Sequence, residues 1–218
     1  GRLVRFVPAS GAASRMFSRL YADRETYQAC RSDSPTAEMS DTEQDLRHFF
    51  DNLPRFAFFE DLARALADDG LDIDQLLAAR DLGTLVRYLL EPCGLGYSDL
   101  PKGLLAFHRT DHGARTPFVE HQAEAALLGG PAGSMRLHFT VTPSHLPLFE
   151  AQRAAWRQTL AETYGCRLEV DYSVQKTSTD TLALAEDDRP LRDENGRLVL
   201  RPGGHGALIE NLQDVRGD

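Results

Sequence analysis

The loop that follows the first apolar segment constrains the fold of this chain more than any other stretch. Leu3–Val7 is predicted to be a buried strand, and it runs into a series of very small residues that ends at Arg15. A helix is predicted from Ser14 to about Tyr21. Small residues allow the backbone to approach a ligand, a helix N-terminus offers free N–H groups, and Arg15 adds a fixed cation. The segment is therefore either a phosphate cradle or a tight turn that binds nothing.

Later segments continue the alternation of strand and helix. Arg136–Thr142 alternates apolar and polar residues as a strand does, and Arg167–Ser173 is the next predicted strand. A long helix from near Pro147 to Tyr164 separates them, and Gly165 ends it. Because helices of this length serve as crossovers, we predict an α/β fold with a mixed, mostly parallel sheet. Ligands bind such sheets at the carboxyl ends of the strands, which is where the first loop lies.

Shorter strands are predicted elsewhere in the chain. One covers Leu104–His108, and two more cover Thr181–Ala185 and Leu198–Leu200. The Asn195-Gly196 pair between the last two is a strong signal for a hairpin turn.

Residues 40–91 are predicted to be entirely helical. Ser40 begins a helix, and Glu43 three residues later completes a capping box. Apolar residues then recur at helical spacing as far as Glu91. We therefore predict a single α/β domain over residues 1–218, with residues 40–91 as a helical insertion.

Composition and charge exclude several classes of protein. The chain has 218 residues and a formal net charge of −9, which argues against binding nucleic acid through a basic surface. No apolar run approaches the roughly 20 residues that cross a bilayer, so no contact with a membrane is expected. The three cysteines, Cys30, Cys93 and Cys166, lie far apart and form no zinc-ligand pattern. These features predict a cytoplasmic protein with reduced thiols.

Three further segments carry residues suited to binding an anion or a base. Lys102 stands between a proline and a glycine as a cation on a stiff loop, or it is an ordinary solvated lysine. Residues 173–181 are polar and follow a predicted strand, where they either donate to a ligand or satisfy their own backbone. Residues 201–208 place three glycines around His205. They form either a loop whose backbone a ligand can approach closely or a flexible turn.

Several segments together resemble the sugar-nucleotide pyrophosphorylases. The Gly-rich loop of those enzymes, which ends in Thr-Arg-Leu or Thr-Arg-Met, is similar to Gly11–Met16. Their Pro-Lys pair with its following leucines is similar to Pro101–Leu105. Their helix that begins Pro-hydrophobic-(Ile/Val)-Glu is similar to Pro117–Gln122. The Pro-x-Gly-(Asn/His)-Gly loop of the uridylyl branch is similar to Pro202–Leu208.

More specifically, the chain resembles the DUF4301 family, whose defining phrases are close to Phe6–Met16, Leu100–His108 and Arg201–Leu212. That resemblance spans nearly the whole chain, but the family name carries no established activity. The pyrophosphorylase likeness implies a Rossmann-like, GT-A-like nucleotidyltransferase fold. It also implies a reaction in which a nucleoside triphosphate and a sugar 1-phosphate give a nucleoside diphosphate sugar and pyrophosphate.

The resemblance assigns roles to single residues. Arg15 and the loop amides would hold the β- and γ-phosphates, and Lys102 would neutralise the α-phosphate, so these are the expected catalytic residues. Gln175 would lie near the base, and His205 would hydrogen-bond the base or the sugar. Mg²⁺ would bridge the phosphates. The expected nucleotide- and substrate-binding residues are Ala9, Ser10, Gly11, Ala12, Ala13, Ser14, Gln175, Gly203, Gly204, His205 and Gly206.

The chain departs from the pyrophosphorylase pattern in three places. Only Gly11 remains of the usual glycines in the first loop. The helical insertion separates Arg15 from Lys102 much further than is usual, and it is expected to be a substrate lid or a subdomain. A strand with a metal-binding Asp follows the second glycine loop in those enzymes, whereas this sequence stops at Asp218. We therefore expect the sheet to be truncated at the C-terminus and the metal ligands to lie beyond Asp218.

Two other classes of function stay open. The same loops would suit a non-catalytic module that binds a nucleotide or a sugar phosphate, or a scaffold whose loops bind no small molecule. Turnover separates the enzyme from the binding module, and ligand binding separates the module from the scaffold. The Pro202–Leu208 loop favours UTP. His108 and His112 are a weaker candidate metal pair, because they flank a predicted turn.

Overall fold

The chain divides into two compact units. The computed structural model describes residues 3–21, 26–27, 30, 40–111, 113–130 and 133–215. Residues 1–10 and 121–218 form the unit that holds the parallel sheet, here called the sheet unit. Residues 11–120 form the other unit, here called the helical unit. No helix in the described ranges is both long and apolar enough to cross a membrane.

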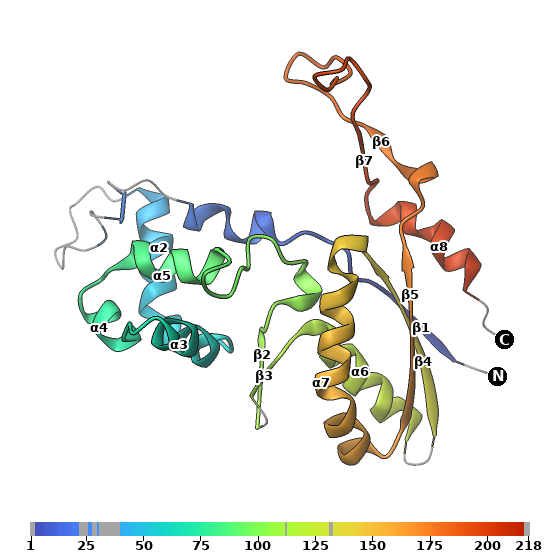
Figure 1. Ribbon diagram of the computed structural model, residues 1–218, viewed down its shortest axis with the longest axis horizontal. Helices are drawn as coiled ribbons and strands as arrows, with labels where there is room; N and C mark the ends of the chain where they lie inside the picture. Colours follow the sequence, from blue (N-terminus) through green and yellow to red (C-terminus); the bar gives the residue numbers. More distant parts are fainter. Residues whose placement is uncertain are drawn as a thin grey trace. The chain divides into compact units, whose positions relative to one another are not determined.

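A three-stranded parallel sheet organises the sheet unit (Figure 1). Its strands are β1 (Val4–Pro8), β4 (Ser134–Val141) and β5 (Arg167–Val174), and β4 pairs in parallel with both neighbours. The helix α7 (Leu146–Tyr164) connects β4 to β5, and α6 (Pro117–Gly129) precedes β4. The molecule is thus a mixed α/β protein with a parallel sheet, as the sequence predicts.

The two faces of the sheet differ in character. Leu137, Phe139 and Val141 of β4 are buried beneath α6 and α7, which lie on the same side of the sheet in Figure 1. Alternate residues of a strand point to opposite faces, so Arg136 and His138 belong to the other face. On β4 that face carries polar residues where the first carries apolar ones.

The chain after β5 forms short elements at the carboxyl end of the sheet. The antiparallel pair of β6 (Thr181–Leu182) and β7 (Leu200–Arg201) is shorter than the predicted strands, and isolated bridges extend the pairing between these two segments. The predicted turn is present, and Gly196 adopts a φ of 75° in it. The remaining elements of the sheet unit are η4 (Pro143–His145), η5 (Thr177–Thr179), β6 (Thr181–Leu182), β7 (Leu200–Arg201), η6 (His205–Leu208) and α8 (Ile209–Asp214).

Short helices dominate the helical unit. The predicted capping box is confirmed, since the Ser40 hydroxyl accepts from the Glu43 amide at 3.3 Å and Glu43 Oε2 accepts from the Ser40 amide at 2.7 Å. The elements are η1 (Ser14–Leu20), α2 (Asp41–Asp51), η2 (Leu53–Arg55), α3 (Phe59–Asp68), α4 (Ile73–Ala78), α5 (Leu82–Leu90), η3 (Lys102–Leu104), β2 (His108–Thr110) and β3 (Gly113–Arg115).

One apolar core holds the helical unit together. Phe58 is almost completely buried, and its ring meets those of Tyr97 and Phe107 edge-on. The predicted strand at Leu104–His108 is wrong. Leu105 is instead fully buried in this core after a turn of 3₁₀ helix, and Leu104 within that turn is buried as well. Only the residues from His108 onward form a strand.

The glycine just after α5 supplies a matched pair of stability tests. A Cβ added at Gly94 would lie 1.9 Å from the Tyr88 carbonyl oxygen, whereas a Cβ at Gly83 would meet nothing closer than Asp81 Oδ1 at 4.0 Å. We expect Gly94→Ala to lower the free energy of unfolding by about 2 kcal/mol or more, because the backbone must move to admit the methyl group.

Gly83→Ala is the control for that substitution. It lies inside α5, so the alanine should raise the free energy of unfolding by roughly 0.5–1 kcal/mol. Urea unfolding of both variants measures the difference. Equal stability for the two would contradict the packing around Gly94.

Candidate functional site

A backbone contact joins the first loop to the Pro-Lys-Gly segment within the helical unit. The Lys102 amide donates to the Gly11 carbonyl at 2.9 Å, and Ala12 forms an antiparallel bridge with Pro101. Pro101 itself is buried, which anchors this segment in the protein. Two segments that are far apart in the sequence therefore lie side by side.

The cations of these two segments are exposed and have no partner in the part of the chain that the structure describes. The Arg15 guanidinium and the Lys102 ammonium form no hydrogen bond or ion pair with any residue in the described ranges. Arg19, one turn further along η1, instead pairs with Asp45 of α2. Arg15 and Lys102 are thus free to meet an anion, whereas Arg19 is committed to the protein.

The helix that follows the loop differs from the one expected. Residues 14–20 form a 3₁₀ helix, and Ala13 before it is fully buried and provides no side-chain cap. The side chain of Ser14 lies outside the described part of the chain. Because a single short 3₁₀ segment has poorer hydrogen-bond geometry than an α-helix, the exposed cations are the main anion-attracting feature here.

The second glycine loop is held by Gln175 within the sheet unit. Gln175 Nε2 donates to the Gly203 carbonyl at 3.2 Å and lies 3.0 Å from Thr179 Oγ1. A Cβ at Gly203 would lie 2.5 Å from the Thr179 carbonyl oxygen, so this glycine is needed for packing inside the protein. A Cβ at Gly204 or Gly206 would meet nothing within 4 Å. The backbone of Gly204, His205 and Gly206 is therefore open to solvent.

The expected binding residues fall into two groups. Gly11, Ala12 and Ala13 belong to the helical unit together with Arg15 and Lys102. The other group belongs to the sheet unit, where the Ala9 amide donates to the Thr140 carbonyl at 2.9 Å. This second group consists of Ala9, Ser10, Gln175, Gly203, Gly204, His205 and Gly206.

A polar cluster on the open sheet face is a further candidate that the sequence did not single out as a group. Ser173 Oγ lies 2.8 Å from His138 Nε2 and accepts from Asn211 Nδ2 at 3.1 Å. Asn211 also donates to the Val174 carbonyl at 2.8 Å, which attaches α8 to the end of β5. Only the parallel register, which pairs Ser173 with Thr140, brings these side chains together.

Several buried atoms of this cluster are unsatisfied. His138 Nδ1, Thr140 Oγ1 and Asn211 Oδ1 are buried and have no hydrogen-bond partner among the described residues. Burial lowers the pKa of the His138 imidazole below its ordinary value, while the Asp171 carboxylate opposes this shift and Arg136 reinforces it. His138 is therefore neutral at pH 7 and stacks against the Phe6 ring at 5.7 Å.

No metal centre is built by the described residues alone. Within those ranges, no three or more His, Cys, Asp and Glu side chains come together as a metal site would require. His108 is exposed at the start of β2, and its weaker candidate partner, His112, lies outside the described residues.

The comparison with known proteins identifies a family but no activity. A family model described as "Domain of unknown function (DUF4301)" matches residues 1–218. No match to this chain was found among curated proteins or among solved structures.

The lowered pKa of His138 gives a prediction for the dependence of stability on pH. The unfolded chain takes up the His138 proton near pH 6.5, before the folded protein does. The free energy of unfolding should therefore be highest above pH 6.5 and should fall as the pH drops towards the folded pKa.

Urea unfolding at pH 7.5 and pH 5.5 measures this slope. His138→Gln removes the titrating group, so the variant should lose less stability over this interval than the unsubstituted protein. The same slope in both proteins would show that His138 does not carry the effect.

Proposed function

The chain belongs to the DUF4301 family, and we propose that it transfers a nucleotidyl group from a nucleoside triphosphate, with UTP favoured, to a sugar 1-phosphate. The observation that carries the proposal is the hydrogen bond from the Lys102 amide to the Gly11 carbonyl. It fastens the Pro-Lys-Gly segment to the small-residue loop and leaves Arg15 and Lys102 exposed beside these segments.

The proposed reaction needs positioning and charge neutralisation more than covalent help. An oxygen of the sugar phosphate attacks the α-phosphorus of the triphosphate. The bond from the α-phosphorus to the oxygen that bridges it to the β-phosphorus breaks, and pyrophosphate leaves with that oxygen. Lys102 would neutralise charge at the α-phosphate, and Arg15 would hold the departing β- and γ-phosphates by its planar donors.

The second glycine loop supports recognition of the base or the sugar. Gln175 uses Nε2 to hold Gly203 and Thr179, while its Oε1 accepts no hydrogen bond from a described residue. That oxygen suits an N–H donor such as the one uracil offers. Gly204 and Gly206 leave space for a sugar, and His205 adds an exposed hydrogen-bonding group.

The proposed reaction also implies a particular fold. We infer a nucleotidyltransferase fold in which the parallel sheet is the catalytic scaffold and residues 40–91 are an insertion. The helices α2 to α5 supply most of the core of the helical unit, and Phe17 of η1 and Leu105 pack into the same core. The cytoplasm is the proposed compartment.

Mg²⁺ is the cofactor that the pyrophosphorylase resemblance implies. The described residues do not bring together a set of metal ligands, so they do not fit a site held by the protein alone. Mg²⁺ commonly keeps its waters and binds substrate phosphates with few protein ligands. The ion would therefore arrive bound to the phosphates of the incoming nucleotide.

Substitution of the two free cations tests the proposal. After a thermal-shift screen with UTP, ATP, GTP, CTP and dTTP, each with Mg²⁺, pyrophosphate release is measured with sugar 1-phosphates. Arg15→Ala and Lys102→Ala should each lower kcat about 100-fold, because each removes charge stabilisation from the transferring phosphates.

Arg64→Ala is the matched control for these substitutions, since Arg64 pairs with Asp61 on the exposed side of α3. It should keep full activity and a full thermal shift. Ligand binding without turnover would favour the non-catalytic module instead. If both cation variants kept normal rates in an active preparation, the assignment of the site would be wrong.

Lysine acylation gives an independent test, because Lys102 and Lys176 are the two lysines of the chain. Lys176 Nζ is paired with Asp214 at 2.7 Å and donates to the Glu210 carbonyl at 3.2 Å, whereas Lys102 is exposed and unpaired. Acetic anhydride should therefore modify Lys102 faster, and bound nucleotide should slow that reaction at least fivefold.

Lys176 is the internal control, and mass spectrometry of the two peptides reads both rates. The Lys176 rate should change less than twofold on adding UTP with Mg²⁺. Full reactivity of Lys102 at a saturating nucleotide concentration would place the phosphates elsewhere.

A further inference from the structure

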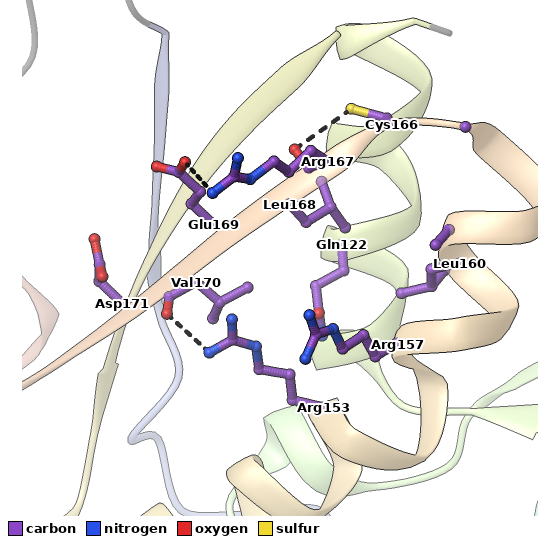
Figure 2. Close-up of a pocket in the computed structure, with 12 residues that line it drawn as sticks. Gln122, Arg153, Arg157, Leu160, Cys166, Arg167, Leu168, Glu169, Val170 and Asp171 are labelled. Atoms are coloured by element: carbon purple, nitrogen blue, oxygen red, sulfur yellow. Dashed lines mark hydrogen bonds and ion pairs between the residues drawn. The ribbon is translucent and has the colours of Figure 1, made fainter. Parts of the chain in front are cut away.

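A cavity of about 650 Å³ lies between α7 and β5 in the sheet unit (Figure 2). Its walls come from α6, α7 and the edge strand β5, and no residue of either glycine loop lines it. Leu160, Leu168 and Val170 provide the apolar part of the wall. A volume of this size is within the range of cavities that hold small ligands.

Two arginines of α7 give this cavity its charge. Arg153 and Arg157 are four residues apart, so they lie on one face of the helix, and both line the cavity. Arg153 donates to the Val170 carbonyl at 3.1 Å, which fixes its guanidinium at the cavity wall. Arg157 forms no hydrogen bond or ion pair with any residue in the described ranges.

The acidic residues of the cavity do not neutralise these arginines. Glu169 faces Arg167 at 3.6 Å, and Asp171 accepts from Arg136 on the open sheet face at 2.7 Å. In Figure 2 both carboxylates point away from Arg157. Arg153 is half-buried and Arg157 is exposed, so these two guanidinium groups give the wall of the cavity a local positive charge although the whole chain is acidic.

A buried amide completes the polar lining. Gln122 of α6 is 2% exposed, and Figure 2 shows its side chain directed towards Arg157. The two guanidinium groups carry the same charge on one face of α7 and repel one another. An anion placed between them relieves that repulsion and gains charge-assisted hydrogen bonds.

We propose that this Arg153–Arg157 pocket binds a small phosphorylated molecule. Planar guanidinium groups match phosphate oxygens in a bidentate manner, and two of them suit a doubly charged group. The pocket shares no residue with the proposed nucleotide site. Its ligand is therefore a second one, and the inference stands whether or not the chain transfers nucleotides.

Calorimetric titration of the full chain with inorganic pyrophosphate tests this pocket, with inorganic phosphate and citrate as comparison anions. Arg157→Gln should raise the Kd for pyrophosphate at least tenfold. Arg157→Lys keeps the charge but loses the planar donors, so it should give an intermediate Kd. Arg189→Gln is the matched control, because Arg189 is 84% exposed and lies near Asp187, and it should change the Kd less than twofold.

Pyrophosphate is also the product of the proposed reaction, so the titration is repeated with Arg15→Ala and Lys102→Ala present together. Binding that persists in this background and is lost with Arg157→Gln supports the pocket, whatever the activity of the protein. An Arg157→Gln variant that binds like the control would overturn the proposal. So would the absence of pyrophosphate binding, or citrate binding as tightly as the phosphates.

Discussion

The hydrogen bond between the Lys102 amide and the Gly11 carbonyl is the constraint on which the candidate phosphate site depends. This hydrogen bond does not position the two segments by itself. Phe17 of η1 and Leu105 after η3 are both buried in the core of the helical unit, so the same apolar cluster anchors each segment. The entropy of closing a loop grows only slowly with its length, so the long helical stretch between the two segments is tolerated when it packs into the same core as they do.

The central strand β4 separates apolar from polar side chains in the sheet unit. Its apolar residues meet α6 and α7, and its polar residues are left to the opposite face. There the unsatisfied atoms of His138, Thr140 and Asn211 carry a cost of about 1–3 kcal/mol each. The register places His138 and Thr140 beside Ser173, so these unsatisfied atoms lie in one cluster near the carboxyl end of β5.

Sequence patterns predicted the elements better than they predicted contacts. The parallel strands, the long helix before Gly165 and the capping box at Ser40 all follow from local periodicity and capping chemistry, and all are present. The pairing of Ala12 with Pro101 depends on tertiary packing and has no local signal. Likewise, two leucines at 104 and 105 fit a strand as well as a 3₁₀ turn, and the burial of Leu105 in the neighbouring aromatic core is a tertiary contact that the sequence does not signal.

An unpaired cation is weak evidence for a ligand on its own, because an exposed guanidinium or ammonium is well solvated. The chain has 33 acidic residues against 24 lysines and arginines, so carboxylates to pair with are plentiful, and Arg19, Arg136 and Lys176 have each found one. The backbone of Lys102 is held by its own amide, and Arg157 lines a cavity wall beside the buried amide of Gln122. A cation that is held in one place without a partner cannot reach a carboxylate elsewhere in the protein. A bound anion is then the interaction that satisfies its charge.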